Sequence, residues 1–130
     1  MSRRILVVDD ESDFLQLVRY RLQDARYEFE FASGGMEALN KARLAMPDLI
    51  LLDLLLPDLD GLTVCEILRR QPSTRGTPVI LITAVNTEAT RFAAQRAGAR
   101  CFLSKPVDFA QLKSAISMAL AGPPRSARAS

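Results

Sequence analysis

Asp53 interrupts an otherwise apolar run over residues 49–56, and Pro47 and Pro57 bound that run. A short run of leucine and isoleucine between prolines predicts a β-strand that is buried on both faces of a sheet. A carboxylate inside such a strand costs several kcal/mol unless it is paired or lies at the strand's end. We therefore expect a strand over residues 49–53 that emerges at Asp53, where the carboxylate has a chemical partner.

The rest of the chain alternates between short apolar runs and segments with helical periodicity. Strands are predicted over residues 5–8, 27–32, 49–53, 78–83 and 101–103, and helices over residues 12–25, 36–45, 62–68, 87–97 and 109–120. Such alternation predicts an α/β fold, a doubly wound parallel sheet with helices on both faces. We expect a flavodoxin-like (βα)5 fold with strand order 2-1-3-4-5.

Composition excludes several classes of protein. The chain of 130 residues contains no histidine, which removes histidine-based general base catalysis and histidine-ligated zinc. Cys65 and Cys101 form no paired motif and are expected to be reduced thiols. With 48% hydrophobic residues and no apolar stretch of membrane-spanning length, a cytoplasmic protein that contacts no membrane is expected. The basic residues between 91 and 113 are separated by apolar positions, which favours a solvated helix face over nucleic-acid binding.

We expect residues 1–121 to form one domain. Residues 122–130 begin with Gly-Pro-Pro and are otherwise polar, which indicates a disordered tail or a truncated linker.

Polar side chains follow four of the predicted strands. Asp9 and Asp10 follow the first, Asp53 ends the third, Thr83 ends the fourth and Lys105 follows the fifth. Open parallel sheets bind ligands beyond the carboxyl ends of their strands, where the strand order reverses. In the expected order that point lies between the first and third strands, so the three carboxylates should converge there.

Carboxylates roughly 5 Å apart repel by about 3 kcal/mol per pair at an effective dielectric near 20. Either some of them hold protons or a cation lies among them. The ligands are hard oxygens, which select Mg²⁺, with Mn²⁺ as a substitute. Thr83 and Lys105 would add a hydroxyl and an ammonium, completing a receptor for a phosphoryl group. Asp53 would then be the nucleophile that forms an acyl phosphate.

Four stretches resemble landmarks of one family, the receiver domains of two-component response regulators, over roughly residues 3–120. They are residues 5–11 (ILVVDDE), Asp53 with residues 57–61 (PDLDG), Thr83-Ala84, and Gly98-Ala99 leading to residues 102–106 (FLSKP). Each stretch is weakly specific alone, but all four in this order and spacing are highly specific.

The resemblance implies that Asp53 accepts a phosphoryl group from a sensor histidine kinase or phosphotransfer protein. It implies that Asp10 and Asp53 bind Mg²⁺ directly with the Leu55 backbone carbonyl, and that Asp9 acts mostly through water. Thr83 would bind the phosphoryl oxygens together with the lysine that follows the fifth strand.

The same resemblance implies a conformational switch that involves Thr83 and Phe102. The hydroxyl moves toward the phosphoryl group, and the ring follows into the space that the hydroxyl leaves. The Lys105-Pro106 bond is expected to be cis. The switch would signal to a downstream effector or a linked output domain.

The chain is expected to be a phosphoacceptor rather than an enzyme, although it would catalyse its own phosphorylation and slow dephosphorylation. Leu55 and Val85 lie two residues after Asp53 and Thr83, at positions that border the path of the attacking water in this family. Neither side chain can orient water by hydrogen bonding, which is why slow dephosphorylation is predicted.

Two alternatives stay open at this point. Asp58 and Asp60 lie in a DxDG motif like that of haloacid dehalogenase-type phosphatases, although the motif does not directly follow a strand. The chain could also be a receiver-like module that binds partners without phosphorylation. The acidic pair at residues 9–10, Asp53 and Lys105 argue against the second alternative.

Overall fold

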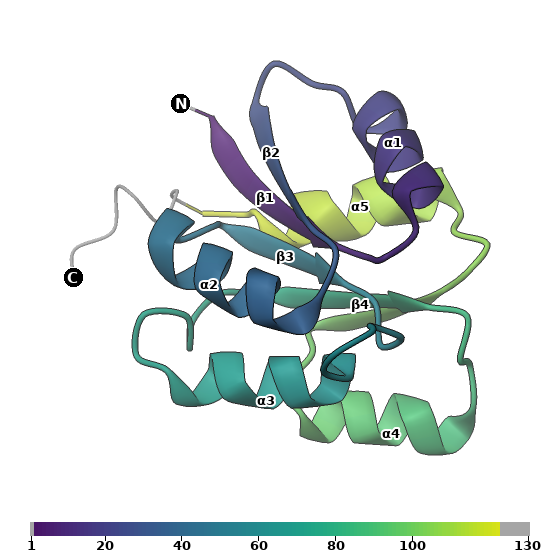
Figure 1. Ribbon diagram of the computed structural model, residues 1–130. Helices are drawn as coiled ribbons and strands as arrows, with labels where there is room; N and C mark the ends of the chain where they lie inside the picture. Colours follow the sequence, from purple (N-terminus) through teal and green to yellow (C-terminus); the bar gives the residue numbers. More distant parts are fainter. Residues whose placement is uncertain (1, 123–130) are drawn as a thin grey trace.

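The computed structural model describes residues 2–122 and contains the predicted five-stranded sheet (Figure 1). Neighbouring strands pair in parallel, in the predicted order β2-β1-β3-β4-β5. The strands are β1 (Arg3–Val8), β2 (Tyr27–Ala32), β3 (Leu49–Leu52), β4 (Val79–Thr83) and β5 (Cys101–Ser104). Apart from Gly122, the predicted tail lies outside the described residues.

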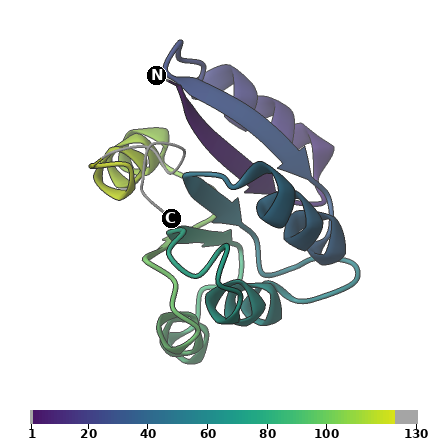
Figure 2. The same cartoon turned by 90° about the vertical axis from the view of Figure 1, so that its left-hand side faces the viewer.

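Five helices cover the sheet on both sides (Figures 1 and 2). They are α1 (Ser12–Arg21), α2 (Gly35–Ala45), α3 (Gly61–Arg70), α4 (Glu88–Arg96) and α5 (Phe109–Ala119). Helices α1 and α5 pack on one face of the sheet, and α2, α3 and α4 pack on the other. Among these described residues, no helix combines the length and the apolar character that crossing a membrane requires.

The three inner strands are buried on both faces because alternate side chains enter two separate cores. Ile5 of β1 lies in the core under α1 and α5, whereas Leu6 lies in the core under α2, α3 and α4. Every residue of β3 and β4 is buried. This two-sided burial explains why these strands read as continuous apolar runs in the sequence.

The predicted end of the first helix was wrong, and the other predicted bounds lie within two residues of the observed ones. Helix α1 ends at Arg21 instead of residue 25, because Asp24 accepts hydrogen bonds from the backbone and guanidinium N–H groups of Arg26 and stabilises a turn there. Strand β3 ends at Leu52, one residue earlier than predicted. The expectation that the strand emerges at Asp53 is nevertheless confirmed, since Asp53 directly follows the last strand residue.

Candidate functional site

Asp9 and Asp53 lie side by side at the carboxyl edge of the sheet, as the strand order predicted. The Asp9 N–H donates to the Ala32 carbonyl (3.0 Å), and the Asp53 N–H donates to the Val8 carbonyl (3.0 Å). These bonds fix the main chain of both residues to the ends of neighbouring strands. Their carboxylates are only 1% and 5% exposed, so the sheet holds two acids almost out of water.

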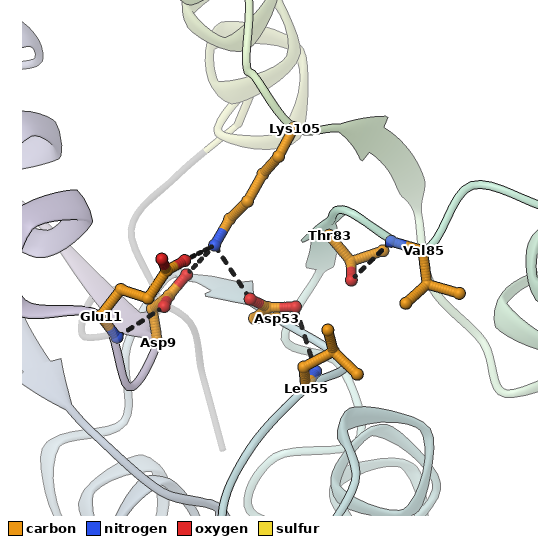
Figure 3. Close-up of polar contacts among 7 residues, drawn as sticks. All are labelled: Asp9, Glu11, Asp53, Leu55, Thr83, Val85 and Lys105. Atoms are coloured by element: carbon orange, nitrogen blue, oxygen red, sulfur yellow. Dashed lines mark hydrogen bonds and ion pairs between the residues drawn. The ribbon is translucent and has the colours of Figure 1, made fainter.

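The ammonium of Lys105 lies between these acids (Figure 3). Its Nζ is 2.6 Å from Asp9 Oδ2, 2.9 Å from Asp53 Oδ2 and 2.9 Å from Glu11 Oε1. A lysine ammonium has three donors, so all three are used in this arrangement. The ring of Phe14 covers the same ammonium, with its centroid 4.3 Å from Nζ. Lys105 follows β5, so the site joins this edge strand to the two neighbouring inner strands β1 and β3.

The electrostatics of the cluster favour a further positive charge. Burial raises the pKa of the Asp9 carboxyl despite its bond to Lys105. Burial alone would lower the pKa of Lys105, but its hydrogen bonds to Asp9, Glu11 and Asp53 outweigh burial and raise it, so the lysine stays charged at neutral pH.

One oxygen from each of three acids, Asp9, Glu11 and Asp53, lies within 4.8 Å of the others. Each pair of ionised groups at that distance repels by about 3.5 kcal/mol at an effective dielectric near 20. One ammonium cannot neutralise three carboxylates. The remaining formal charge of −2 and the all-oxygen donor set match a divalent hard cation.

Glu11 was missed as a site residue by the sequence reasoning, whereas Asp10 was included. Asp10 is exposed and does not belong to the group of clustered acids. The Glu11 N–H donates to Asp9 Oδ1 (2.9 Å), which turns the chain so that the Glu11 side chain reaches Lys105. The acidic pair Asp9-Asp10 after the first strand indicated the site, but the sequence did not show that Glu11 faces it instead of Asp10. Direct binding of Mg²⁺ by Asp10 stays a prediction.

The loop after Asp53 orients its carboxylate. The Leu55 N–H donates to Asp53 Oδ1 (3.1 Å), while Asp53 Oδ2 faces the ammonium (Figure 3). The Gly61 N–H donates to the Leu54 carbonyl (2.9 Å), which brings the first residue of α3 against the loop. A Cβ at Gly61 would lie 2.3 Å from the Asp53 carbonyl oxygen, so only glycine allows this approach. The role of the Leu55 carbonyl stays a prediction.

The two residues predicted to form the switch share one face of the sheet. Thr83 pairs with Ser104 across β4 and β5, so Phe102, two residues earlier in β5, points to the same side as Thr83. Thr83 is fully buried, and its Oγ1 accepts a bond from the Val85 N–H (3.3 Å). Phe102 is half-buried against the core under α2, α3 and α4.

The loop after β5 contains a cis peptide bond between Lys105 and Pro106. The Lys105 N–H donates to the Thr83 carbonyl (3.0 Å), which holds the start of this loop beside the end of β4. The lysine stem therefore leaves the sheet next to Thr83 and reaches across to the acids (Figure 3).

Asp58 and Asp60 cap helices, which disfavours the phosphatase alternative. Asp58 accepts bonds from the N–H groups of Gly35 (2.7 Å) and Met36 (3.0 Å) at the start of α2. These bonds and one from the Leu59 N–H lower the pKa of Asp58 to about 2. Asp60 accepts bonds from the backbone and side chain of Thr63 at the start of α3. Both carboxylates therefore have a structural role, and this role explains the DxDG motif without phosphatase chemistry.

Comparison with known proteins agrees with the geometry. The profile of the response regulator receiver domain family matches residues 5–117. The response regulator PleD of Caulobacter vibrioides is 43% identical over 118 residues, which cover 88% of this chain and 26% of PleD. The alkaline phosphatase synthesis transcriptional regulatory protein PhoP of Bacillus subtilis is 42% identical over 106 residues, which cover 82% of this chain and 43% of PhoP. The chain thus spans less than half the length of these relatives.

A solved structure of a putative response regulator from Chloroflexus aurantiacus superposes with a TM-score of 0.88 at 32% identity, covering 94% of this chain and all of that chain. The sequence match extends from β1 into α5 and includes each strand end that contributes to the acidic cluster. The chain belongs to the response regulator receiver domain family, whose members are signalling domains rather than conventional enzymes.

Proposed function

We propose that Asp53 of this receiver domain accepts a phosphoryl group in a Mg²⁺-dependent reaction. The observation that carries the proposal is the Lys105 ammonium, which contacts both buried carboxylates, Asp9 and Asp53. A buried carboxylate beside an ammonium and a cation site has the groups that phosphoryl transfer requires, which are a nucleophile and positive charge for the phosphoryl oxygens.

The oxygens of Asp9, Glu11 and Asp53 fit a magnesium ion, because they are hard ligands with an uncompensated negative charge. By family resemblance Asp10 and the Leu55 carbonyl would complete the set, and Mn²⁺ could substitute. When bound, the ion would neutralise charge on the transferring phosphoryl group.

The residues of the chain hold the nucleophile in place. One Asp53 oxygen is held by the Leu55 amide and the other by the Lys105 ammonium, so the carboxylate plane is fixed. An Asp53 oxygen attacks the phosphorus of a phosphohistidine or acyl phosphate donor, and the bond from phosphorus to the leaving group breaks with its electron pair. Lys105 and the Thr83 hydroxyl then donate to the phosphoryl oxygens of the acyl phosphate.

Formation of that acyl phosphate would draw the Thr83 hydroxyl away from the Val85 N–H. The Phe102 ring, on the same face of the sheet, would move toward the space left behind. We infer that the donor is a sensor histidine kinase or phosphotransfer protein, and that the changed face signals to an effector or a linked output domain. We further propose a cytoplasmic location and no direct nucleic-acid contact by this domain.

Intact mass spectrometry after incubation with acetyl phosphate and Mg²⁺ tests the proposal. The wild-type chain should gain one phosphoryl group, and the gain should be absent with EDTA. Asp53→Asn should gain none, whereas Asp58→Asn, which changes another acid, should gain as much as wild type. If Asp53→Asn still gained a phosphoryl group and Asp58→Asn gained none, Asp58 would be the acceptor and the proposal would be wrong.

A further inference from the structure

The exposed side of the Phe102 ring is covered by an arginine from α4. The Cζ atom of Arg91 lies over the ring, 5.0 Å from its centroid. Phe102 is half-buried, so the guanidinium covers a ring face that the core leaves open. Such a cation–π contact at an exposed site is weak but directional.

Arg91 is itself held in place by the loop between β4 and α4. Its Nε donates to Asn86 Oδ1 at 2.7 Å, within the normal range for a hydrogen bond. Its backbone N–H donates to the Thr87 carbonyl, so the first turn of α4 carries the residue. The guanidinium is therefore attached at one end to the loop and stacks at the other on the ring.

The same loop is attached to Thr83. The Val85 N–H donates to Thr83 Oγ1, and Val85 is the neighbour of Asn86 in the chain. A continuous series of contacts thus joins the buried hydroxyl, the loop, the arginine and the ring. Movement of the hydroxyl breaks the first contact, and movement of the ring breaks the last.

We propose that Arg91, oriented by Asn86, is a positioning residue that holds Phe102 in its half-buried place and opposes the switch. This inference rests on the proposed phosphorylation of Asp53. When the ring moves inward it leaves the guanidinium, so the contact stabilises only the resting state. A ligand that favours the inward ring must overcome this contact, and its apparent affinity is reduced accordingly.

Titration with beryllofluoride in excess Mg²⁺, followed by calorimetry, tests the proposal. Arg91→Met keeps an unbranched apolar stem but removes the guanidinium, and Asn86→Ala removes the attachment without changing charge. We expect Arg91→Met to bind beryllofluoride about two- to fivefold more tightly than wild type, the range of an exposed cation–π contact. Asn86→Ala should shift in the same direction.

Arg96→Met is the matched control. Arg96 lies on the same helix and its Cζ lies 5.8 Å from the centroid of the exposed Phe92 ring, so the change removes an equal charge and a similar contact. The control should bind beryllofluoride like wild type or more weakly. The ring signal of Phe102 in NMR spectra, assigned by Phe102→Leu, should move toward its beryllofluoride-bound position in Arg91→Met alone.

Equal affinities for Arg91→Met and Arg96→Met, or an unmoved Phe102 signal in Arg91→Met, would overturn this inference and leave the proposed function intact. A wild-type chain that binds no beryllofluoride would overturn both.

Discussion

Replacing Gly61 with alanine should displace the loop that carries Asp53. The added Cβ would lie 2.3 Å from the Asp53 carbonyl oxygen and 2.7 Å from Leu54 Cα. Ordinary contact begins at 3.4 Å, so the loop or the start of α3 must move by about 1 Å. Both contacts are with main-chain atoms, which cannot swing aside as a side chain can.

The magnitude follows from three terms. Overpacking of this kind costs about 1–3 kcal/mol. Loss of the bond from the Gly61 N–H to the Leu54 carbonyl costs about 1 kcal/mol more. The better helix propensity of alanine returns up to about 1 kcal/mol, which leaves a net loss on the order of 2 kcal/mol. A reacting group misplaced by about 1 Å can slow a reaction on the order of a hundredfold.

Urea unfolding and the rate of phosphorylation by acetyl phosphate in saturating Mg²⁺ measure the two effects. Gly76→Ala is the control, because a Cβ at Gly76 meets nothing within 4 Å. Gly61→Ala should lose stability and phosphorylate much more slowly, whereas the control should match wild type in both assays. If the two variants behave alike, the close approach does not position Asp53 and the reasoning is refuted.

Three further predictions concern the charge of the site, the cap on α2 and the path of water to Asp53. Lys105→Met should lower the free energy of unfolding by about 3 kcal/mol at pH 8 in EDTA, because it leaves buried carboxylates without their partner. Since burial already raises the pKa of Asp9, the deficit should shrink as the pH falls or when Mg²⁺ is added; a deficit indifferent to both in urea titrations would contradict this. The pKa of Asp58 is lowered from 3.8 to about 2, so its carboxylate contributes stability above pH 4 that is lost as the pH falls toward 2. Thermal melts of Asp58→Asn should therefore differ from wild type at pH 6 and converge with it near pH 2, and a constant difference would count against the capping role. Val85→Asn, which places a polar group beside the predicted path of water, should shorten the lifetime of phosphorylated Asp53 severalfold in Mg²⁺ buffer; an unchanged decay by mass spectrometry would exclude that role for Val85.

The sequence predicted the alternation of strands and helices and the approximate strand ends because both depend on local patterns, whereas the strand order was taken from the flavodoxin-like fold. The apolar run before Asp53 predicted that this residue lies at a strand end. The short apolar run that corresponds to β5 predicted the same for Lys105. Parallel pairing then brought these ends to one edge. No contact between distant residues had to be known in advance.

Side-chain direction after a strand could not be predicted in the same way. Asp9, Asp10 and Glu11 are adjacent acids, and only the turn made by the Glu11 N–H and Asp9 Oδ1 decides that Glu11 reaches Lys105. Helix α1 was predicted to be too long because local hydrogen bonds, which the apolar pattern does not reveal, end it. Leu22 is buried and continues the apolar stripe, although the local bonds of Asp24 already end the helix.

Non-local packing also escaped the sequence reasoning. The switch role of Phe102 was inferred from the family resemblance, but the stacking of Arg91 on its ring, which joins α4 to β5, was not predicted. The long-range caps on α2 were equally unexpected. The DxDG pattern left Asp58 open as a catalytic residue, whereas its bonds to the N–H groups of Gly35 and Met36 show that it caps α2.

The position of the phosphoryl group in the chain shows whether Asp53 is the acceptor. Chains treated with acetyl phosphate and Mg²⁺ can be reduced with borohydride, which converts an acyl phosphate to an alcohol, and then mapped by peptide mass spectrometry. We expect a single reduced side chain, at position 53. Reduction at Asp9, Asp58 or Asp60 with Asp53 unchanged would contradict it.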